Sequence, residues 1–413
     1  MPAILEQAWA VLQDQALCDE CLGRQFAKRG HGFSNAQRGH ALRVTLCLQH
    51  DAQLPEPELC PLCMNHFHNV PEWAERVYQA LLPYEFERYL MGTRPPGFLE
   101  DAERQLRRRH GLDAAEPLKQ GFNRAVGKQF GELIQTRQGR PTRVDFQHPE
   151  ITVYADLIWE KLSVQVNPLY VFGRYCKHVR GIPQTRWPCT FCKGRGCAQC
   201  RGSGQQYPES VESLIGEPLR SLCQGQDCIL HGAGREDIDA RMLGTGRPFV
   251  LEVKHPVKRF FDWAQVAEHI NQCAQGKASV LDLRPVNGAA VGTIKEQEAH
   301  KRYRAQLVLG QPICAQAFQR ALQSLVGPIR QRTPQRVSHR RADLWRQREV
   351  FSIQGRLTGE LVAEVEVHCS GGLYVKELIS GDEGRTQPSL AQALGTSASV
   401  SELDVIEVAG SFL

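Results

Sequence analysis

The segment GAGREDIDARMLGTGRPFVLEV, residues 232–253, concentrates the most informative chemistry in the chain. Gly-Arg-Glu-Asp (234–237) precedes Ile-Asp-Ala-Arg (238–241), and a glycine-rich turn then leads into the strand-like run 248–253. Carboxylates beside arginines near a strand end are found in catalytic sites, but they also form simple salt-bridge clusters. The residues alone leave both possibilities open.

This segment lies in the first part of the largest expected domain, residues 207–413. Helical spacing of apolar residues predicts a helix over 262–274. Apolar alternation predicts strands at 248–253, 360–368, 373–379 and 403–408. Strands at hairpin spacing with helices between them favour a mixed, mainly antiparallel sheet with flanking helices, which is an α+β architecture.

The upstream sequence predicts further domains. With 413 residues, the chain is too long for one compact core, so we expect two or three domains. A helical pattern at 74–92 and strand-like runs at 151–157 and 161–172 predict an α/β module. The expected division is multidomain: 1–66, 67–175, a basic cysteine-rich connector at 176–206, and 207–413.

The first two C-x-x-C pairs predict a structural metal site. Cys18, Cys21, Cys60 and Cys63 form two pairs with 38 residues between them, a gap that a helix could fill. Two such turns supply the four thiolates of a closed tetrahedral zinc site. His66 and His68 are possible substitute ligands, although surface histidines are the simpler interpretation. The alternative for the cysteines is coincidental spacing of free thiols.

The connector carries a second quartet: Cys189, Cys192, Cys197 and Cys200. The unit C-x-x-C-x-G-x-G occurs twice in succession and resembles the cysteine-rich repeats of the DnaJ chaperones. Glycine after each pair permits the positive φ that brings a backbone N–H toward sulfur. Only four residues separate the pairs, so one shared ion would be tight. A second zinc is possible, with an iron–sulfur cluster as the alternative.

A basic run lies between residues 330 and 348. It contains seven arginines, among them Arg336, Arg340 and Arg341, against the single acid Asp343. Such a run suits contact with a polyphosphate backbone, although charge runs are also typical of a solvated face.

The whole composition constrains the protein class less than the motifs do. The formal net charge of +5 is too small to identify nucleic acid as a partner. The first residues have the pattern of an amphipathic helix and not of a signal peptide, and no apolar run of about 18 residues occurs. We therefore expect a cytoplasmic protein without a membrane span.

These motifs together resemble the archaeal-type tRNA pseudouridine(54/55) synthases. Residues 234–249 resemble that family's signature G-R-E-D-V-D-x-R-x-L-G-x-G-R-P-F, and residues 374–390 match its G-D-x-G-R-T-x-P motif. Further segments resemble the family's connector, tyrosine motif, basic segment and last strand, in the same order, at 174–189, 301–308, 332–341 and 401–408. The resemblance spans nearly the whole chain.

The resemblance implies a zinc-knuckle module, a THUMP-like RNA-binding domain at 67–175 and a pseudouridine synthase catalytic domain at 207–413. It implies that Asp237 is the nucleophile, attacking C1′ or C6 of the target uridine, with Lys376 as its basic partner. Tyr303 would stack on the flipped base or take the proton from C5, and Leu403 would flank the base. Arg235 would fill the gap in the RNA or hold a phosphate, while Asp239 and Arg241 would form a supporting salt bridge.

The implied substrate is the T-arm of tRNA, at uridines 54 and 55. Arg336, Arg340 and Arg341 are then candidate substrate-binding residues, and neither a catalytic cofactor nor an obligate protein partner is expected. One alternative is a different THUMP-type tRNA enzyme, a thiouridine synthase or methyltransferase. The other is a non-catalytic zinc-dependent RNA-binding protein, which would differ only in the role of Asp237.

Overall fold

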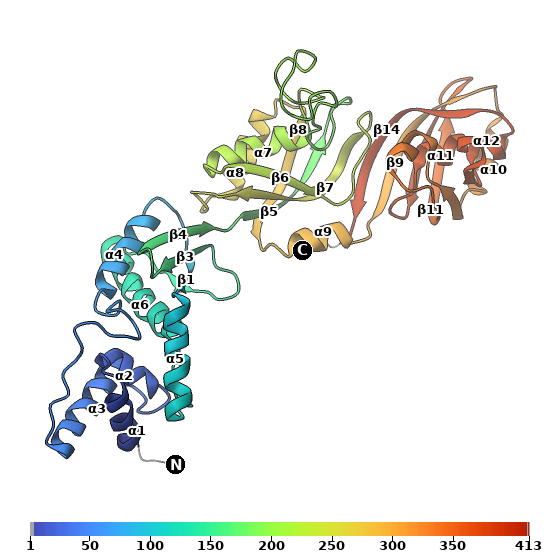
Figure 1. Cartoon of the computed structure of the whole chain (residues 1–413). Coiled ribbons are helices and arrows are strands. Elements are labelled where there is room, and N and C mark those ends of the chain that lie inside the picture. The colour runs from blue at the N-terminus through green and yellow to red at the C-terminus, as the bar shows by residue number, and fades with distance from the viewer. Residues whose placement is uncertain (1–3, 411, 413) are drawn as a thin grey trace. The chain divides into compact units, whose positions relative to one another are not determined.

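The computed structural model describes residues 4–410 and 412, except for the side chains of His339 and Arg340. The chain forms two compact units, Met1–Asn167 and Pro168–Leu413, called here the N-terminal and C-terminal units (Figure 1). Among the described helices, none is long and apolar enough to cross a membrane.

The division between the units splits a run that the sequence suggested was one strand. Residues 161–172 contain β4 (Lys161–Val166), which pairs with β3, and the start of β5 (Leu169–Lys177), which pairs with β7 and β8. Pro168 between them has no N–H to donate to a ladder. The C-terminal unit therefore begins at 168, whereas the sequence placed the end of the α/β module at 175.

The first part of the N-terminal unit is helical. The amphipathic pattern at the start forms α1 (Ile4–Asp14), and α2 (Asp19–Gln25) and α3 (Asn35–His50) fill the gap between the first two cysteine pairs. A Cβ on Gly23 would lie 1.8 Å from the Asn35 carbonyl oxygen, and one on Gly39 would lie 1.8 Å from that of Asp19. Only glycine allows the backbones of α2 and α3 to approach this closely.

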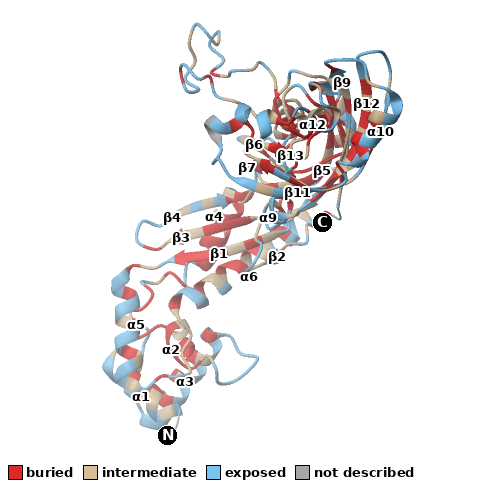
Figure 2. Cartoon of the chain, turned by 90° about the vertical axis from the view of Figure 1, so that its right-hand side faces the viewer, coloured by how far each residue is buried: buried red, intermediate tan, exposed pale blue. Residues whose placement is uncertain are grey.

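The second part of this unit is a four-stranded sheet in the order β2-β1-β3-β4. Its strands are β1 (Arg88–Arg94), β2 (Arg143–Val144), β3 (Ile151–Asp156) and β4. Helices α4 (Val70–Leu81) and α6 (Leu118–Gln138) pack against it, and α5 (Gly97–His110) follows β1. Figure 2 shows buried residues concentrated on β1 and β3.

Two details of this unit differ from the sequence prediction. The predicted helix 74–92 ends at Leu81, and its second half enters β1. The polar, arginine-rich region 95–150 contains α5 and α6. Helix α6 buries Phe122, Val126, Phe130 and Ile134 at helical spacing, but Gly121 and Gly127 on the same face add no apolar side chain to the pattern.

The C-terminal unit is built on a ten-stranded sheet in the order β13-β10-β11-β12-β9-β14-β7-β5-β8, with β6 also paired to β7. Every pairing is antiparallel except the short parallel contact of β14 with β7. Besides β5, the strands are β6 (Asp227–Gly232), β7 (Arg241–Lys254), β8 (Ala278–Val286), β9 (His300–Leu309), β10 (Gly327–Arg332), β11 (Trp345–Leu357), β12 (Val362–Cys369), β13 (Thr386–Gln387) and β14 (Ala398–Ala409). The expected α+β class is confirmed.

Two hydrophobic cores divide this sheet. The first lies under β5–β8 with α7 (Val211–Leu222), α8 (Trp263–Cys273) and α9 (Ala290–Glu296). The second lies under β9–β12 with α10 (Ala315–Gln323), α11 (Val375–Ser380) and α12 (Leu390–Leu394). The two groups of helices are separated in Figure 1.

Strand β7 joins the two halves. Its first residues pair with β14, and the remainder pairs with β5 and β6. Gly244 lies between these parts with φ of +60°, and a Cβ there would be 1.9 Å from the Ile406 carbonyl oxygen. Glycine is therefore required where β7 bends against β14.

The predicted strand at 373–379 is wrong. Residues Val375–Ser380 form α11, in which Val375, Leu378 and Ile379 contact the second core at helical spacing. Gly381 ends the helix with φ of +82°. A short apolar run fits either periodicity, and tertiary packing selects the helix here.

Candidate active site

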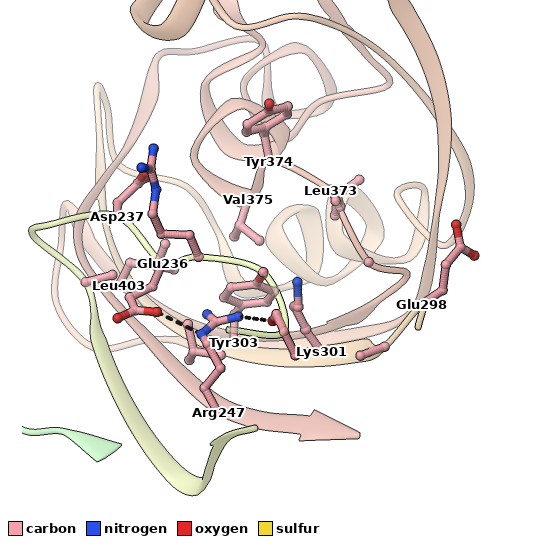
Figure 3. Close-up of a pocket in the computed structure, with 18 of the residues that line it drawn as sticks. Glu236, Asp237, Arg247, Glu298, Lys301, Tyr303, Leu373, Tyr374, Val375 and Leu403 are labelled. Atoms are coloured by element: carbon pink, nitrogen blue, oxygen red, sulfur yellow. Dashed lines mark hydrogen bonds and ion pairs between the residues drawn. The ribbon is translucent and has the colours of Figure 1, made fainter. Parts of the chain in front are cut away.

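Asp237 lies in the loop between β6 and β7, on the wall of a cavity of about 460 Å³ (Figure 3). The other walls come from β9, β14, the 3-10 helix η1 (Gln335–Arg340) and residues 371–376. A groove of about 260 Å³ also reaches Asp237, and Trp187 and Arg235 line it. The carboxylate is about a third exposed, so a substrate can reach it.

Two cations reach the Asp237 carboxylate. Arg336 Nη1 lies 3.0 Å from one oxygen and 3.1 Å from the other, and Lys376 Nζ lies 3.6 Å away. Arg336 is fixed on its other side by Glu377, whose carboxylate oxygen is 2.6 Å from Nε. Burial lowers the pKa of Arg336, but its bonds to Glu377 and Asp237 outweigh that effect and raise it above the ordinary value. The guanidinium stays charged beside the carboxylate.

Lys376 has a second, closer partner. Its Nζ lies 2.7 and 2.9 Å from the two Asp239 oxygens. Burial raises the pKa of Asp239, but the hydrogen bond and the charge of Lys376, with smaller contributions from a backbone hydrogen bond and from Arg336, together leave that pKa below the ordinary value. The sequence prediction of an Asp239–Arg241 salt bridge is wrong, because Arg241 instead makes two bonds of 2.9 and 2.7 Å to Asp404 on β14.

The floor of the cavity is formed by β9. Tyr303 and Lys301 are two residues apart on this strand, and Figure 3 shows both side chains directed toward the cavity. Leu403 on β14 lies on the wall near Asp237. Burial, with the neighbouring Cys369 thiol, raises the pKa of the Tyr303 phenol well above its ordinary value. The phenol therefore keeps its proton at neutral pH.

A buried charge cluster supports the Asp237 loop from below. The Glu236 carboxylate is fully buried and accepts bonds from Tyr175 Oη at 2.8 and 3.0 Å and from Arg247 Nε at 2.8 Å. Lys177 Nζ lies 4.0 Å from the same carboxylate.

The two cations of this cluster also hold the loop backbone. Arg247 Nη1 donates to the Ala233 carbonyl, and Lys177 Nζ donates to the carbonyls of Asp237 and Ile238 at 3.2 and 3.1 Å. Because these groups are buried, the backbone of Asp237 has little freedom to move. The cluster therefore sets the position of the carboxylate.

The remaining predicted residues surround this centre. The Arg235 guanidinium lies 5.7 Å from the centroid of the Trp187 ring, within cation–π range. Arg341 lines the cavity and donates a 3.0 Å bond to the Tyr374 hydroxyl. Arg340 ends η1, and its side chain lies outside the described part of the structure. Apart from Arg340, the structure brings every predicted RNA-site residue to the cavity or the groove.

Both predicted cysteine quartets assemble. In each, the four Sγ atoms lie within 4.8 Å of one another. The Cys18–Cys63 Sγ–Sγ distance is 3.7 Å, and three of the Sγ–Sγ distances in the second quartet are 4.0, 3.8 and 3.6 Å. Four sulfurs at about 2.3 Å from a tetrahedral zinc would be roughly 3.8 Å apart. Each quartet could therefore hold one metal ion, including the second, which the sequence suggested would be tight.

The histidines beside the first quartet have different positions. His66 is 3% exposed, and its Nε2 lies 3.0 Å from the Leu157 carbonyl oxygen, so the interpretation of this residue as a surface histidine is wrong. His68 is exposed, as expected, and faces Glu56. Four thiolates are already present without either ring.

The second quartet follows the expected glycine pattern. Gly196 N donates to Cys192 Sγ and Gly204 N donates to Cys200 Sγ, both at 3.2 Å, and both glycines have positive φ. A Cβ on Gly204 would lie 2.4 Å from the Gly194 carbonyl oxygen, so the two turns pack backbone to backbone. The connector is thus a small finger within the C-terminal unit.

Sequence reasoning missed three parts of the site. It did not identify the cluster of Glu236, Arg247 and Lys177, because nothing in sequence distinguishes a buried charge from a surface one. It assigned Arg336 to the substrate, although Arg336 is the nearest cation to Asp237. It also overlooked Lys301, although its spacing from Tyr303 places both side chains on one face of a strand.

Comparison with known proteins identifies the family. Residues 170–409 match the family described as "Pus10, C-terminal", and residues 73–156 match "Pus10 THUMP domain, archaeal". Proteins named tRNA pseudouridine synthase Pus10 are similar along nearly their whole length. That of Halorubrum lacusprofundi is 44% identical over 98% of this chain and 96% of its own, and that of Methanothrix thermoacetophila is 39% identical over 98% and 95%.

The relative from Archaeoglobus fulgidus, with the same name, is 43% identical over 85% of this chain and 95% of its own. The two family matches cover strands β1, β2 and β3 of the N-terminal sheet and almost all of the C-terminal unit. On these grounds, the chain belongs to the Pus10 family.

Proposed function

We propose that this protein is a tRNA pseudouridine synthase that converts uridine to pseudouridine at positions 54 and 55 of the T-arm. The observation that carries the proposal is the position of Asp237. Its carboxylate lies on the wall of a nucleotide-sized cavity, within 3.0 Å of Arg336 and 3.6 Å of Lys376, with Tyr303 on the floor. Relatives named tRNA pseudouridine synthase, similar over 98% of the chain, support the same activity.

The proposed reaction begins when the target uridine leaves its stack and enters the cavity. An enzyme that acts on a base within folded RNA must extrude it, and unstacking costs a few kcal/mol. The uracil would lie over Tyr303 and beside Leu403, which together offer an aromatic and an apolar surface. Arg235 and Trp187 line the adjoining groove, where the neighbouring nucleotides would lie.

Asp237 then acts as the nucleophile, at C1′ or C6. Arg336 and Lys376 orient the carboxylate, and the buried Glu236 cluster fixes its backbone. Preorganised charges of this kind act before the reaction starts, so little reorganisation is needed in the transition state. With attack at C1′, the glycosidic bond breaks as Asp237 bonds to C1′, the uracil turns, and the C5=C6 electron pair joins C5 to C1′ as the Asp237–C1′ bond breaks, while the N1 lone pair forms the C6=N1 bond.

The tRNA body must be held outside the cavity. The N-terminal unit contains the THUMP domain, and we propose that it binds the tRNA. The arginines of η1 and the basic finger residues Lys193, Arg195 and Arg201 would contact phosphates. A broad contact surface offsets the cost of extruding a base from the T-arm.

We also propose that each cysteine quartet binds one structural zinc ion. Four thiolates at the observed separations match tetrahedral zinc coordination and leave no open position. The backbone N–H bonds to Cys192 and Cys200 would stabilise thiolates in the finger. The proposed location of the protein is the cytoplasm, where the thiols would stay reduced.

The test compares Asp237→Asn with Asp282→Asn, an exposed carboxylate on β8. Unmodified tRNA transcript is incubated with each protein, and pseudouridine is mapped by position. We expect wild type and Asp282→Asn to modify positions 54 and 55, and Asp237→Asn to bind tRNA without modifying it. Full activity of Asp237→Asn would show that Asp237 is not the nucleophile, and wild-type protein that binds tRNA without modifying it would favour the alternative assignment of this chain as an RNA-binding module.

A further inference from the structure

The amine of Lys301 lies in the cavity and has no role in the reaction steps assigned above to Asp237 and Tyr303. It lies on β9 two residues before Tyr303, and its side chain points into the cavity beside that ring (Figure 3). Among the described residues, no carboxylate forms an ion pair with Nζ. An unpaired amine in a partly buried cavity is unusual, because lysine is rarely removed from water without a counter-ion.

The surroundings of Lys301 disfavour an ammonium ion. A Cβ on Gly234 would be 3.2 Å from Lys301 Nζ and 3.3 Å from Arg247 Nη1, so both cationic groups flank the same point. The nearby Glu236 carboxylate is already bonded to Arg247 and Tyr175. Burial, and next the charge of Arg247, lower the pKa of Lys301 to about 8, while Cys369 and Glu236 act in the opposite direction.

The proposed reaction requires a base at this place. After C5 has joined C1′, C5 carries both a hydrogen and the sugar, and aromaticity returns only when that proton leaves. Tyr303 is the other candidate, but its buried phenol holds its proton at neutral pH. A base must hold a free lone pair at the working pH, and a partly neutral amine meets that condition.

We propose that Lys301 is the catalytic base that removes the C5 proton of the isomerised uracil. The Nζ lone pair takes the proton, and the C5–H electron pair forms the C5=C6 double bond. The C6=N1 electron pair moves onto N1, which takes one proton from water. One proton leaves C5 and one joins N1, so no oxidant or reductant is needed. This inference rests on the proposed pseudouridine synthase activity.

The position of Lys301 fits this role and not that of the nucleophile. Asp237 comes from the loop before β7 and approaches from the wall, whereas Lys301 approaches from the floor with Tyr303. The sugar would therefore face the carboxylate while the uracil ring faces the amine. The titratable groups that act on the amine are Arg247, Glu236 and the Cys369 thiol, and Lys295, Glu296 and Glu298 line the same cavity.

The experiment uses the full-length zinc-loaded protein in single-turnover reactions with two tRNA transcripts. One carries uridine at the target position, and the other carries 5-fluorouridine, which has no C5 proton to remove. Lys301→Met removes the base, and Lys301→Arg keeps a cation that cannot act as a base near neutral pH. Lys258→Met, at an exposed lysine far along the chain from β9, is the matched control.

We expect both Lys301 variants to convert uridine at least about 100-fold more slowly, the lower end of general-base contributions. Both should still break the glycosidic bond of the 5-fluorouridine transcript at the wild-type rate, which also shows that they fold and bind tRNA. Equal slowing on both transcripts, or full activity of Lys301→Arg, would overturn the assignment. Wild-type protein that makes no pseudouridine would instead overturn the proposed function.

Discussion

Glu236→Gln tests whether the buried charge cluster holds the active-site loop. The substitution keeps the size of the side chain but leaves Arg247, which is 1% exposed, without its carboxylate. It also removes the carboxylate that lies 4.0 Å from the buried Lys177 Nζ. Breaking a buried ion pair by removing one partner costs about 3–5 kcal/mol. Because one factor of ten corresponds to about 1.4 kcal/mol, local opening should rise roughly 10²- to 4 × 10³-fold.

Amide hydrogen exchange of the full-length protein measures the rise in local opening around Arg247. Peptides that span β7 report the opening of the strand that carries Arg247, without assuming that both units unfold together. Glu252→Gln is the matched control on the same strand. Its partners Lys254 and His231 are closer to solvent, so we expect a loss below about 1 kcal/mol.

The double variant Glu236→Gln with Arg247→Met tests whether the loss of stability comes from the unpaired charge of Arg247. If the cost arises from an unpaired buried charge, removing both partners should restore about 2 kcal/mol relative to the sum of the single changes. Strictly additive effects, or protection of β7 in Glu236→Gln equal to that in wild type, would show that the pair does not stabilise the loop.

Four other outcomes are expected. Cys60→Ser should lower the zinc content, measured by mass spectrometry of the metal, from about two ions per chain to about one, and should weaken protection in α2. Gly244→Ala should destabilise the C-terminal unit by at least about 1–3 kcal/mol in denaturant unfolding, because its Cβ would clash with the Ile406 carbonyl. Arg336→Met should reduce single-turnover pseudouridine formation more than Lys376→Met, because Arg336 is the closer cation to Asp237; the reverse order would contradict the assignment. The wild-type rate should rise about tenfold per pH unit and level off above about pH 8, because only the neutral form of Lys301 accepts a proton; a rate that falls over this range would argue against it.

The sequence predicted those parts of the fold whose pattern is local. The alternation at 360–368 and 403–408 became β12 and β14, and the helical spacing at 262–274 became α8. The short run at 373–379 failed, because its apolar residues satisfy both periods and only contact with the second core selects the helix.

In the candidate site, too, motifs of neighbouring residues were predictable, whereas contacts between residues far apart in the sequence were not. The motifs singled out Asp237, Tyr303 and the two cysteine quartets, and the structure brings the first two to one cavity and the sulfur atoms of each quartet close together. The partners of Asp239 and Arg241 could not be predicted, because those contacts join residues more than 130 positions apart. Pairings of that kind depend on which strands become neighbours, and here β14 returns to lie beside β7.

Because β7 joins the two halves of the C-terminal sheet, substitutions far from the cavity can affect the active site. The loop of Asp237 is held by Tyr175 of the first core, whereas Lys376 stands on α11 of the second core, and Tyr303 touches both cores. The distance between the Asp237 carboxylate and the Lys376 ammonium group therefore depends on how the two hydrophobic cores are aligned. Substitution of a leucine in either core would shift this distance by a fraction of an ångström. The catalytic rate would then fall before the melting temperature changed measurably.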